Sequence, residues 1–142
     1  LMDMGLEAYQ VAASVRLSLT QRLVRRLYAD CREEAPPDAA NALLRAELEA
    51  AFGADARVTL YVARVRGCPA CQNTGWRGRA GVFELLEMTP AVQQLLMTGC
   101  VSEGLRRHAR RTLRQAALRL AAGGVTSLEE AVRTTPSDPR AE

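Results

Sequence analysis

The motif Cys68-Pro-Ala-Cys71 constrains the fold of this chain more than any other feature of its sequence. Two thiolates separated by two residues on a tight turn can bind one tetrahedral zinc ion, with metal–sulfur distances of about 2.3 Å. Cys31 is the obvious third ligand, because a metal could close the long segment that separates it from Cys68. The sequence therefore indicates a candidate zinc site made by Cys31, Cys68 and Cys71.

The fourth ligand of this candidate site has no obvious source. A paired upstream knuckle would place a cysteine at position 28, where the sequence has Tyr28. Asp30, Cys100 or His108 could replace it only if the fold brings one of them near. A metal-free turn held by packing and hydrogen bonds is the alternative interpretation, and the sequence leaves both open. A redox pair of the thioredoxin type is less favoured, because no helix is predicted to begin at Cys68 and lower its pKa.

All 19 basic residues of the 142-residue chain are arginines, and lysine is absent. Lysine chemistry is therefore excluded within this chain, including a Schiff base and the P-loop lysine that contacts nucleotide phosphates. The P-loop pattern Gly-x-x-x-x-Gly-Lys-Ser/Thr is also absent, so a phosphate cradle for a nucleoside triphosphate would lie elsewhere. The four cysteines and the lack of a signal-peptide pattern predict a cytoplasmic location with reduced thiols.

Hydrophobic periodicity and turn signals predict an α+β fold. Hydrophobic residues make up 48% of the chain, enough for a globular core, and no apolar run approaches the ~18 residues of a membrane span. Helices are expected at 6–19, 38–52, 90–97 and 102–122, with Asp38 and Thr89 as N-caps and a last short helix opened by Thr126. Strands are expected at 21–28, 58–65 and 82–88, a linker at 32–38 and a turn-rich loop at 67–81. We expect the strands at 22–27 and 81–88 to lie side by side, with the segment 28–77 inserted between them.

Two arginine-rich segments could contact anionic partners such as phosphate, acidic protein surfaces or lipid headgroups. One face of the helix predicted at 102–122 carries Arg106, Arg107, Arg110, Arg111 and Arg114. An ordinary solvated face is the more common explanation of such a pattern. No aromatic residues lie between these arginines, which argues against nucleic acid as a partner. In the second segment, Arg77 and Arg79 lie between glycines and could present bidentate donors to a phosphate or carboxylate.

Three stretches of the chain, taken in order, resemble one protein family: LMDMGLEAYQVAASVRLSLTQRLVRRL, GCPACQNTGWRGRAGVFELL and GVTSLEEAVRTT. The resemblance is to the C-terminal part of the ATPases that serve type II secretion and type IV pilus assembly, the secretion E-protein family. It covers residues 1–135, and three motifs in order are more specific than a single C-x-x-C pair. The nucleotide-binding motifs of the family would lie upstream of Leu1, so the chain is expected to be a fragment of a longer protein.

The resemblance implies four parts: the end of a RecA-like ATPase core at 1–27, an inserted zinc-ribbon-like subdomain at 28–77, a closing strand with C-terminal helices at 78–135 and a flexible tail at 136–142. It also implies a cytoplasmic hexamer, peripheral to the bacterial inner membrane, that docks on platform proteins and hydrolyses ATP with magnesium in its full-length form. This chain by itself is expected not to hydrolyse ATP. Arg79 is implied to face the nucleotide or a neighbouring subunit.

The chain departs from the family pattern at two places. The family's zinc subdomain commonly has two C-x-x-C pairs; here Cys31, Cys68 and Cys71 match, Tyr28 stands in the fourth ligand place, and Cys100 matches no ligand position. The family often has Asp-Gly after a Leu-Arg pair in its long helical region. Here Gln-Ala-Ala follows Leu113 and Arg114, which predicts a straighter helix.

The alternative function is a zinc-knuckle module that binds protein or nucleic acid and is unrelated to ATPases. The stretch CPACQNTG resembles one knuckle of the heat-shock cochaperones, with Asn73 in the place of the first glycine. Those proteins use several knuckles, whereas this chain offers one. A P-loop and acidic motifs upstream of Leu1 would discriminate in favour of the ATPase family.

Overall fold

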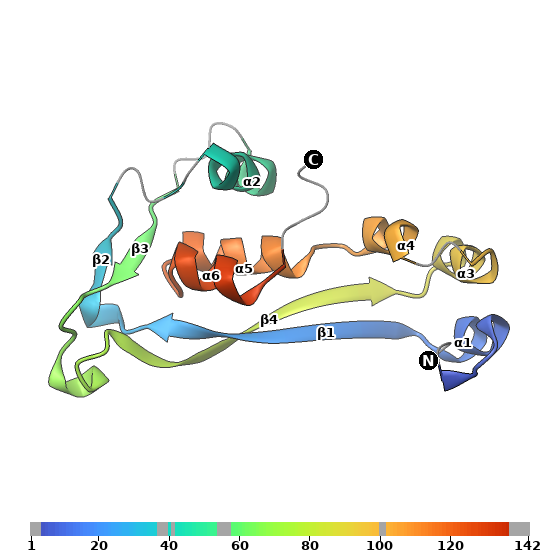
Figure 1. Ribbon diagram of the computed structural model, residues 1–142, viewed down its shortest axis with the longest axis horizontal. Helices are drawn as coiled ribbons and strands as arrows, with labels where there is room; N and C mark the ends of the chain where they lie inside the picture. The colour runs from blue at the N-terminus through green and yellow to red at the C-terminus, as the bar shows by residue number, and fades with distance from the viewer. Residues whose placement is uncertain (1–3, 37–39, 41, 54–57, 100–101, 137–142) are drawn as a thin grey trace. The chain divides into compact units, whose positions relative to one another are not determined.

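The computed structural model describes residues 4–36, 40, 42–53, 58–99 and 102–136. Over these residues the structure combines helices with two small antiparallel sheets, which confirms the predicted α+β class (Figure 1). The chain divides into two compact units, each made of two segments. The first unit combines Leu1–Thr20 with Phe83–Thr112, and the second combines Gln21–Val82 with Leu113–Glu142.

Two long strands, β1 (Leu17–Leu27) and β4 (Trp76–Glu87), pair with each other. This pair confirms the prediction that the segments 22–27 and 81–88 lie side by side. The unit boundary crosses both strands, so each unit contains one part of the β1–β4 ribbon. Apart from the two ribbon strands, the described elements of the second unit that precede α5 lie in the sequence between Leu27, where β1 ends, and Trp76, where β4 begins.

Besides its part of the ribbon, the first unit contains the α-helices α1 (Ala8–Ser14), α3 (Pro90–Met97) and α4 (Ser102–His108). Its buried core is formed by Val11, Ala12 and Leu96. The N-cap predicted for α3 is confirmed, because the Thr89 hydroxyl accepts a hydrogen bond from the main-chain N–H of Val92 at 3.4 Å.

The second unit surrounds its part of the ribbon with short strands and helices: β2 (Arg32–Glu34), α2 (Ala42–Phe52), β3 (Tyr61–Ala63), α5 (Leu113–Ala122) and α6 (Leu128–Thr134). Strands β2 and β3 are antiparallel, with Glu33 opposite Val62. One apolar cluster joins the ribbon to α5 and α6 through Val24, Val82, Leu113, Ala117, Ala121 and Ala131. A second cluster joins α2 to the same two helices through Leu48, Leu118 and Leu128.

Several predicted boundaries are wrong because pairing between distant segments decides them. The helix predicted at 6–19 ends at Ser14, and Leu17 already belongs to β1. The predicted linker at 32–38 contains β2, the predicted loop at 67–81 contains the start of β4, and the strand predicted at 58–65 is limited to β3. Hydrogen bonds to a partner strand outweigh local propensity at these places. The predicted N-cap Asp38 lies outside the described residues.

The single helix predicted at 102–122 is also wrong, because α4 and α5 are separate helices with 109–112 between them. Leu105 of α4 packs against the core of the first unit. Leu113 and Ala117 of α5 belong to the core of the second unit. The two helices therefore bury their apolar side chains in different cores.

Arg114, which was predicted on a solvated basic face, is buried instead. Its side chain is 6% exposed, and its Nε atom lies 3.4 Å from Oε2 of Glu47, whose side chain is also 6% exposed. This ion pair joins α5 to α2 inside the second unit. A buried charge that loses its partner is strongly destabilising, so the pair restricts how α2 can sit on α5.

Glu130 is a second buried charge that joins distant elements of the second unit. Helix α6 starts one residue later than predicted, because Ser127 rather than Thr126 is its N-cap. This places the Glu130 carboxylate, 2% exposed, where it accepts hydrogen bonds from Nη2 of Arg25 at 2.8 Å and Nη2 of Arg133 at 2.7 Å. Burial raises the pKa of Glu130, but the hydrogen bonds from Arg25 and Arg133 outweigh it and lower the pKa to about 2.

Replacing Glu130 with glutamine is expected to lower the free energy of unfolding near pH 7 by on the order of 2–3 kcal/mol. The folded-state pKa of about 2 lies below the ordinary value of 4.5, so this contribution is present above pH 4.5 and is lost as the pH falls toward 2. Urea unfolding of both proteins at several pH values measures the difference, and the exposed neighbour Glu129→Gln is the control. A difference between Glu130→Gln and the unmodified protein that stays constant with pH would contradict the ion-pair explanation.

Candidate metal centre

Two turns of the second unit carry the three candidate ligands. The 3-10 turn η2 (Ala29–Cys31) follows β1, and the 3-10 turn η3 (Pro69–Cys71) precedes β4. Cys68 is the N-cap of η3, which is a three-residue 3-10 turn and not an α-helix. Pro69 occupies the first position of that turn, where its fixed φ and missing N–H cost nothing.

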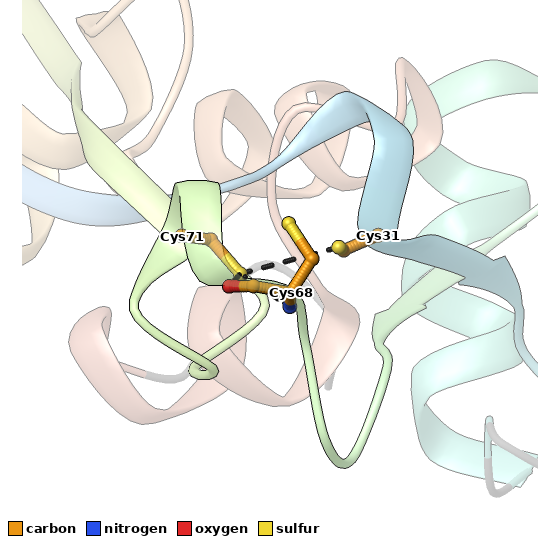
Figure 2. Close-up of side chains that lie close together, drawn as sticks. All are labelled: Cys31, Cys68 and Cys71. Atoms are coloured by element: carbon orange, nitrogen blue, oxygen red, sulfur yellow. Dashed lines mark hydrogen bonds between the residues drawn. The ribbon is translucent and has the colours of Figure 1, made fainter.

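The sulfur atoms of Cys31, Cys68 and Cys71 all lie within 4.8 Å of one another (Figure 2). The Sγ atoms of Cys71 and Cys31 are 4.0 Å apart. Sulfur ligands around one tetrahedral zinc ion lie about 3.8 Å apart, because each metal–sulfur bond is about 2.3 Å long. The structure therefore brings the three predicted thiols into an arrangement that is compatible with zinc, here called the three-thiol cluster.

The backbone around Cys71 is folded tightly enough that glycine is required at position 67. Gly67 has a φ of +45°, and a Cβ atom there would lie 2.7 Å from the main chain of Asn73 and 2.8 Å from the Cys71 sulfur. Gln72 and Asn73 both have positive φ values and reverse the chain directly after Cys71. This turn aims the main-chain N–H groups of neighbouring residues at one sulfur atom.

Main-chain hydrogen bonds stabilise the thiolate form of Cys71. Its sulfur accepts from the N–H groups of Cys68 at 3.1 Å and Gly75 at 3.2 Å. Burial raises the pKa of Cys71, but these hydrogen bonds outweigh it and lower the pKa to about 7. A thiolate is the form that ligates metal, so the polypeptide prepares Cys71 for that role.

The pKa of Cys31 is raised, not lowered, in the protein without metal. Cys31 is 1% exposed, and burial together with hydrogen bonding to Cys68 and Cys71 raises its pKa to about 12. Cys31 therefore stays a neutral thiol near pH 7 in the absence of a cation. A divalent metal would supply the positive charge that lets all three ionise. The donor set and its hydrogen bonds fit a zinc ion on these grounds.

The fourth ligand place differs from the other three. Among the described histidine, cysteine, aspartate and glutamate residues none completes the cluster, so Asp30 and His108 do not serve. Cys100 lies outside the described residues. Tyr28 stays the predicted occupant of the fourth place; its N–H donates to the carbonyl of Gly75, directly beside the η3 turn. A hydrogen bond with Asp30 raises the pKa of the Tyr28 hydroxyl, so the phenol is a poor metal ligand.

Arg79 lies in β4 with an exposed side chain, and no described contact tests its predicted place near a nucleotide. In addition to the cluster, the structure shows a contact that the sequence did not predict, the stacking of Arg25 on Trp76. The Arg25 guanidinium lies 4.4 Å from the centroid of the Trp76 ring, and the same group binds Glu130. No local pattern signals this contact, because the three residues come from β1, β4 and α6.

Comparison with known proteins places the chain in one family. The family model described as "Type II/IV secretion system protein" matches residues 1–133. The chain is 36% identical to the type II secretion system ATPase E of Vibrio cholerae over 138 residues, which is 95% of this chain and 26% of that protein. It is 33% identical to the type IV pilus assembly ATPase PilB of Myxococcus xanthus over 142 residues, 97% of this chain and 24% of that protein.

The chain belongs to the type II/IV secretion system protein family. This confirms the family predicted from the three sequence motifs. The chain spans about a quarter of the length of these two curated relatives.

We predict that the unmodified protein binds zinc sub-stoichiometrically or not at all, and that Tyr28→Cys raises the zinc content to about one ion per chain. Four thiolates form a closed structural site, whereas three leave an open position that favours metal loss. Elemental analysis after exchange into chelator-treated buffer measures the content. Tyr9→Cys adds a thiol at a residue that is 58% exposed in the other unit and should leave the zinc content unchanged. Full occupancy before the substitution, or no gain after it, would contradict the assignment of Tyr28 to the fourth place.

Proposed function

We propose that this chain is the C-terminal region of a bacterial ATPase that powers type II protein secretion or type IV pilus assembly, and that it is not catalytic by itself. The family match over residues 1–133 carries the proposal. The absence of lysine supports the non-catalytic part, because a P-loop needs a lysine beside the nucleotide phosphates. The relatives named above are ATPases of those two systems, and each is about four times as long as this chain.

The exposed side chains of the ribbon support a place at the end of a larger, RecA-like core. In the first unit, the alternate positions Leu17 and Leu19 of β1 are 51% and 53% exposed. Phe83 and Leu85 of β4 are 46% and 39% exposed in the same unit. Large apolar side chains gathered on one small element generally pack against another part of the protein. Residues 1–27 would then end the ATPase core, and 78–135 would return to it; the predicted tail lies outside the described residues except for Pro136.

The segment 28–77 is proposed to be a zinc-ribbon-like insertion of that core. Its two ends meet where Tyr28 donates to the Gly75 carbonyl at 2.9 Å. Cys31, Cys68 and Cys71 would hold a zinc ion between the η2 and η3 turns. Such an ion would act structurally, by fixing the two turns through which the insertion leaves and re-enters the ribbon.

The full-length protein is proposed to work as a hexamer in the cytoplasm, at the inner membrane, on platform proteins of a secretion or pilus system. ATP and magnesium would bind outside this chain, with Arg79 near the nucleotide or a neighbouring subunit. None of the helices in the described part of the chain has the length and apolar character needed to cross a membrane. Since the family is shown, a zinc-knuckle module unrelated to ATPases is no longer the competing interpretation.

The purified 142-residue chain is expected to release no phosphate from ATP above background in the presence of magnesium. Phosphoryl transfer needs a phosphate cradle and a carboxylate that holds the metal, and neither motif is present in the sequence. A coupled phosphate assay on chain whose folding is verified by circular dichroism makes the measurement. Magnesium-dependent release that Arg79→Ala abolishes and Arg66→Ala leaves intact would contradict the proposal.

A further inference from the structure

An open cavity of about 590 Å³ lies in the second unit, and none of the three cysteines lines it. It is lined by Arg32, Phe52, Val58, Thr59, Tyr61, Arg119, Ala122 and Gly123. Among the described residues of this lining, two are arginines and none is acidic. A volume of this size is typical of ligand sites, and the charge of the lining favours an anionic ligand.

The first of these arginines is held in place by an aromatic ring and a helix end. The Arg32 guanidinium lies 4.7 Å from the centroid of the Tyr61 ring on the paired strand β3. Its Nη1 atom donates to the carbonyl of Gly124 at 3.1 Å. A Cβ atom at Gly124 would lie 2.7 Å from that nitrogen, so glycine at this position leaves room for the arginine.

The second arginine has the same kind of support from other elements. The Arg119 guanidinium of α5 lies 5.0 Å from the centroid of the Phe52 ring, and its Nη2 atom donates to the carbonyl of Ala51 at 3.0 Å. A guanidinium carries five N–H donors, so each arginine retains donors for a ligand after this single bond. Both are exposed yet restricted in orientation, which lowers the entropy that a ligand must overcome.

The shape and charge of the cavity distinguish between anionic ligands. Helices α2 and α5 both end at residues that line the cavity, Phe52 and Ala122. The partial negative charge of helix C-termini disfavours a dense anion such as a polyphosphate. Separate carboxylates can each pair with one planar guanidinium, and Phe52, Val58 and Tyr61 offer apolar surface beside them.

We propose that this cavity binds a peptide segment of a partner protein in which carboxylate side chains alternate with apolar ones. The carboxylates accept hydrogen bonds from Arg32 and Arg119, and an apolar side chain packs against the apolar surface that Phe52, Val58 and Tyr61 offer in the lining. The proposal rests on the described residues of the second unit and does not depend on ATP hydrolysis.

Fluorescence anisotropy with a fluorescein-labelled peptide of alternating glutamate and leucine tests the proposal on the purified protein. We expect saturable binding that weakens at least about tenfold in Arg32→Gln and in Arg119→Gln, because each loses a charge-assisted hydrogen bond. Arg66→Gln removes the same charge from an exposed residue of the same unit outside the cavity and should leave binding within about twofold.

A second pair of variants keeps the test decisive if an arginine variant fails to fold. Thr59 lines the cavity with an exposed side chain, so Thr59→Glu adds a repelling charge without removing a described contact. Thr59→Glu should weaken peptide binding at least about tenfold, whereas Thr59→Gln should not.

Three results would overturn the proposal. The peptide fails to bind at any accessible concentration, which would leave the arginines a structural role at the helix ends. Arg66→Gln weakens binding as much as the cavity variants, which would indicate non-specific attraction. Sodium tripolyphosphate displaces the peptide at lower concentrations than a glutamate-rich competitor, which would indicate a phosphate site.

Discussion

Three sulfur atoms from two turns lie close together where the chain leaves β1 and where it enters β4. Cys31 follows one strand of the ribbon and Cys68 with Cys71 precedes the other, and their sulfurs lie within 4.8 Å of one another. The strands β2 and β3 of the segment between them pair over only three residues, so that sheet alone gives the segment little support. A zinc ion bound by the three thiolates would fix the two ends of this segment relative to each other in the folded protein.

Buried ion pairs connect helix α6 to strand β1 and helix α2 to helix α5. Glu130 of α6 binds Arg25 of β1, and the same guanidinium stacks on Trp76 at the start of β4. Glu47 of α2 pairs with Arg114 of α5. Each of these pairs disfavours arrangements that would leave a charge buried without its partner. A few directional contacts therefore fix how the helices pack around the apolar clusters of the second unit.

The sequence predicted the parts of the site that depend on local spacing. Cys68 and Cys71 lie on one turn because proline and glycine force it, and Cys31 was correctly expected to join them. The break between α4 and α5 was missed, because the helical periodicity of 102–122 carries no sign that its halves belong to different cores. The roles of Glu130 and of the cavity arginines were missed for a similar reason. Each contact joins residues that are far apart in the sequence and separately resemble ordinary surface charges.

X-ray absorption spectroscopy at the zinc edge tests the central claim most directly. The protein would be loaded with one equivalent of zinc, and the number and type of scatterers around the metal would be determined. The three-thiol cluster predicts three sulfur ligands at about 2.3 Å and one lighter oxygen or nitrogen ligand. Two or fewer sulfurs would contradict the closure of the insertion by Cys31, Cys68 and Cys71, and four would show that a further cysteine occupies the place assigned to Tyr28.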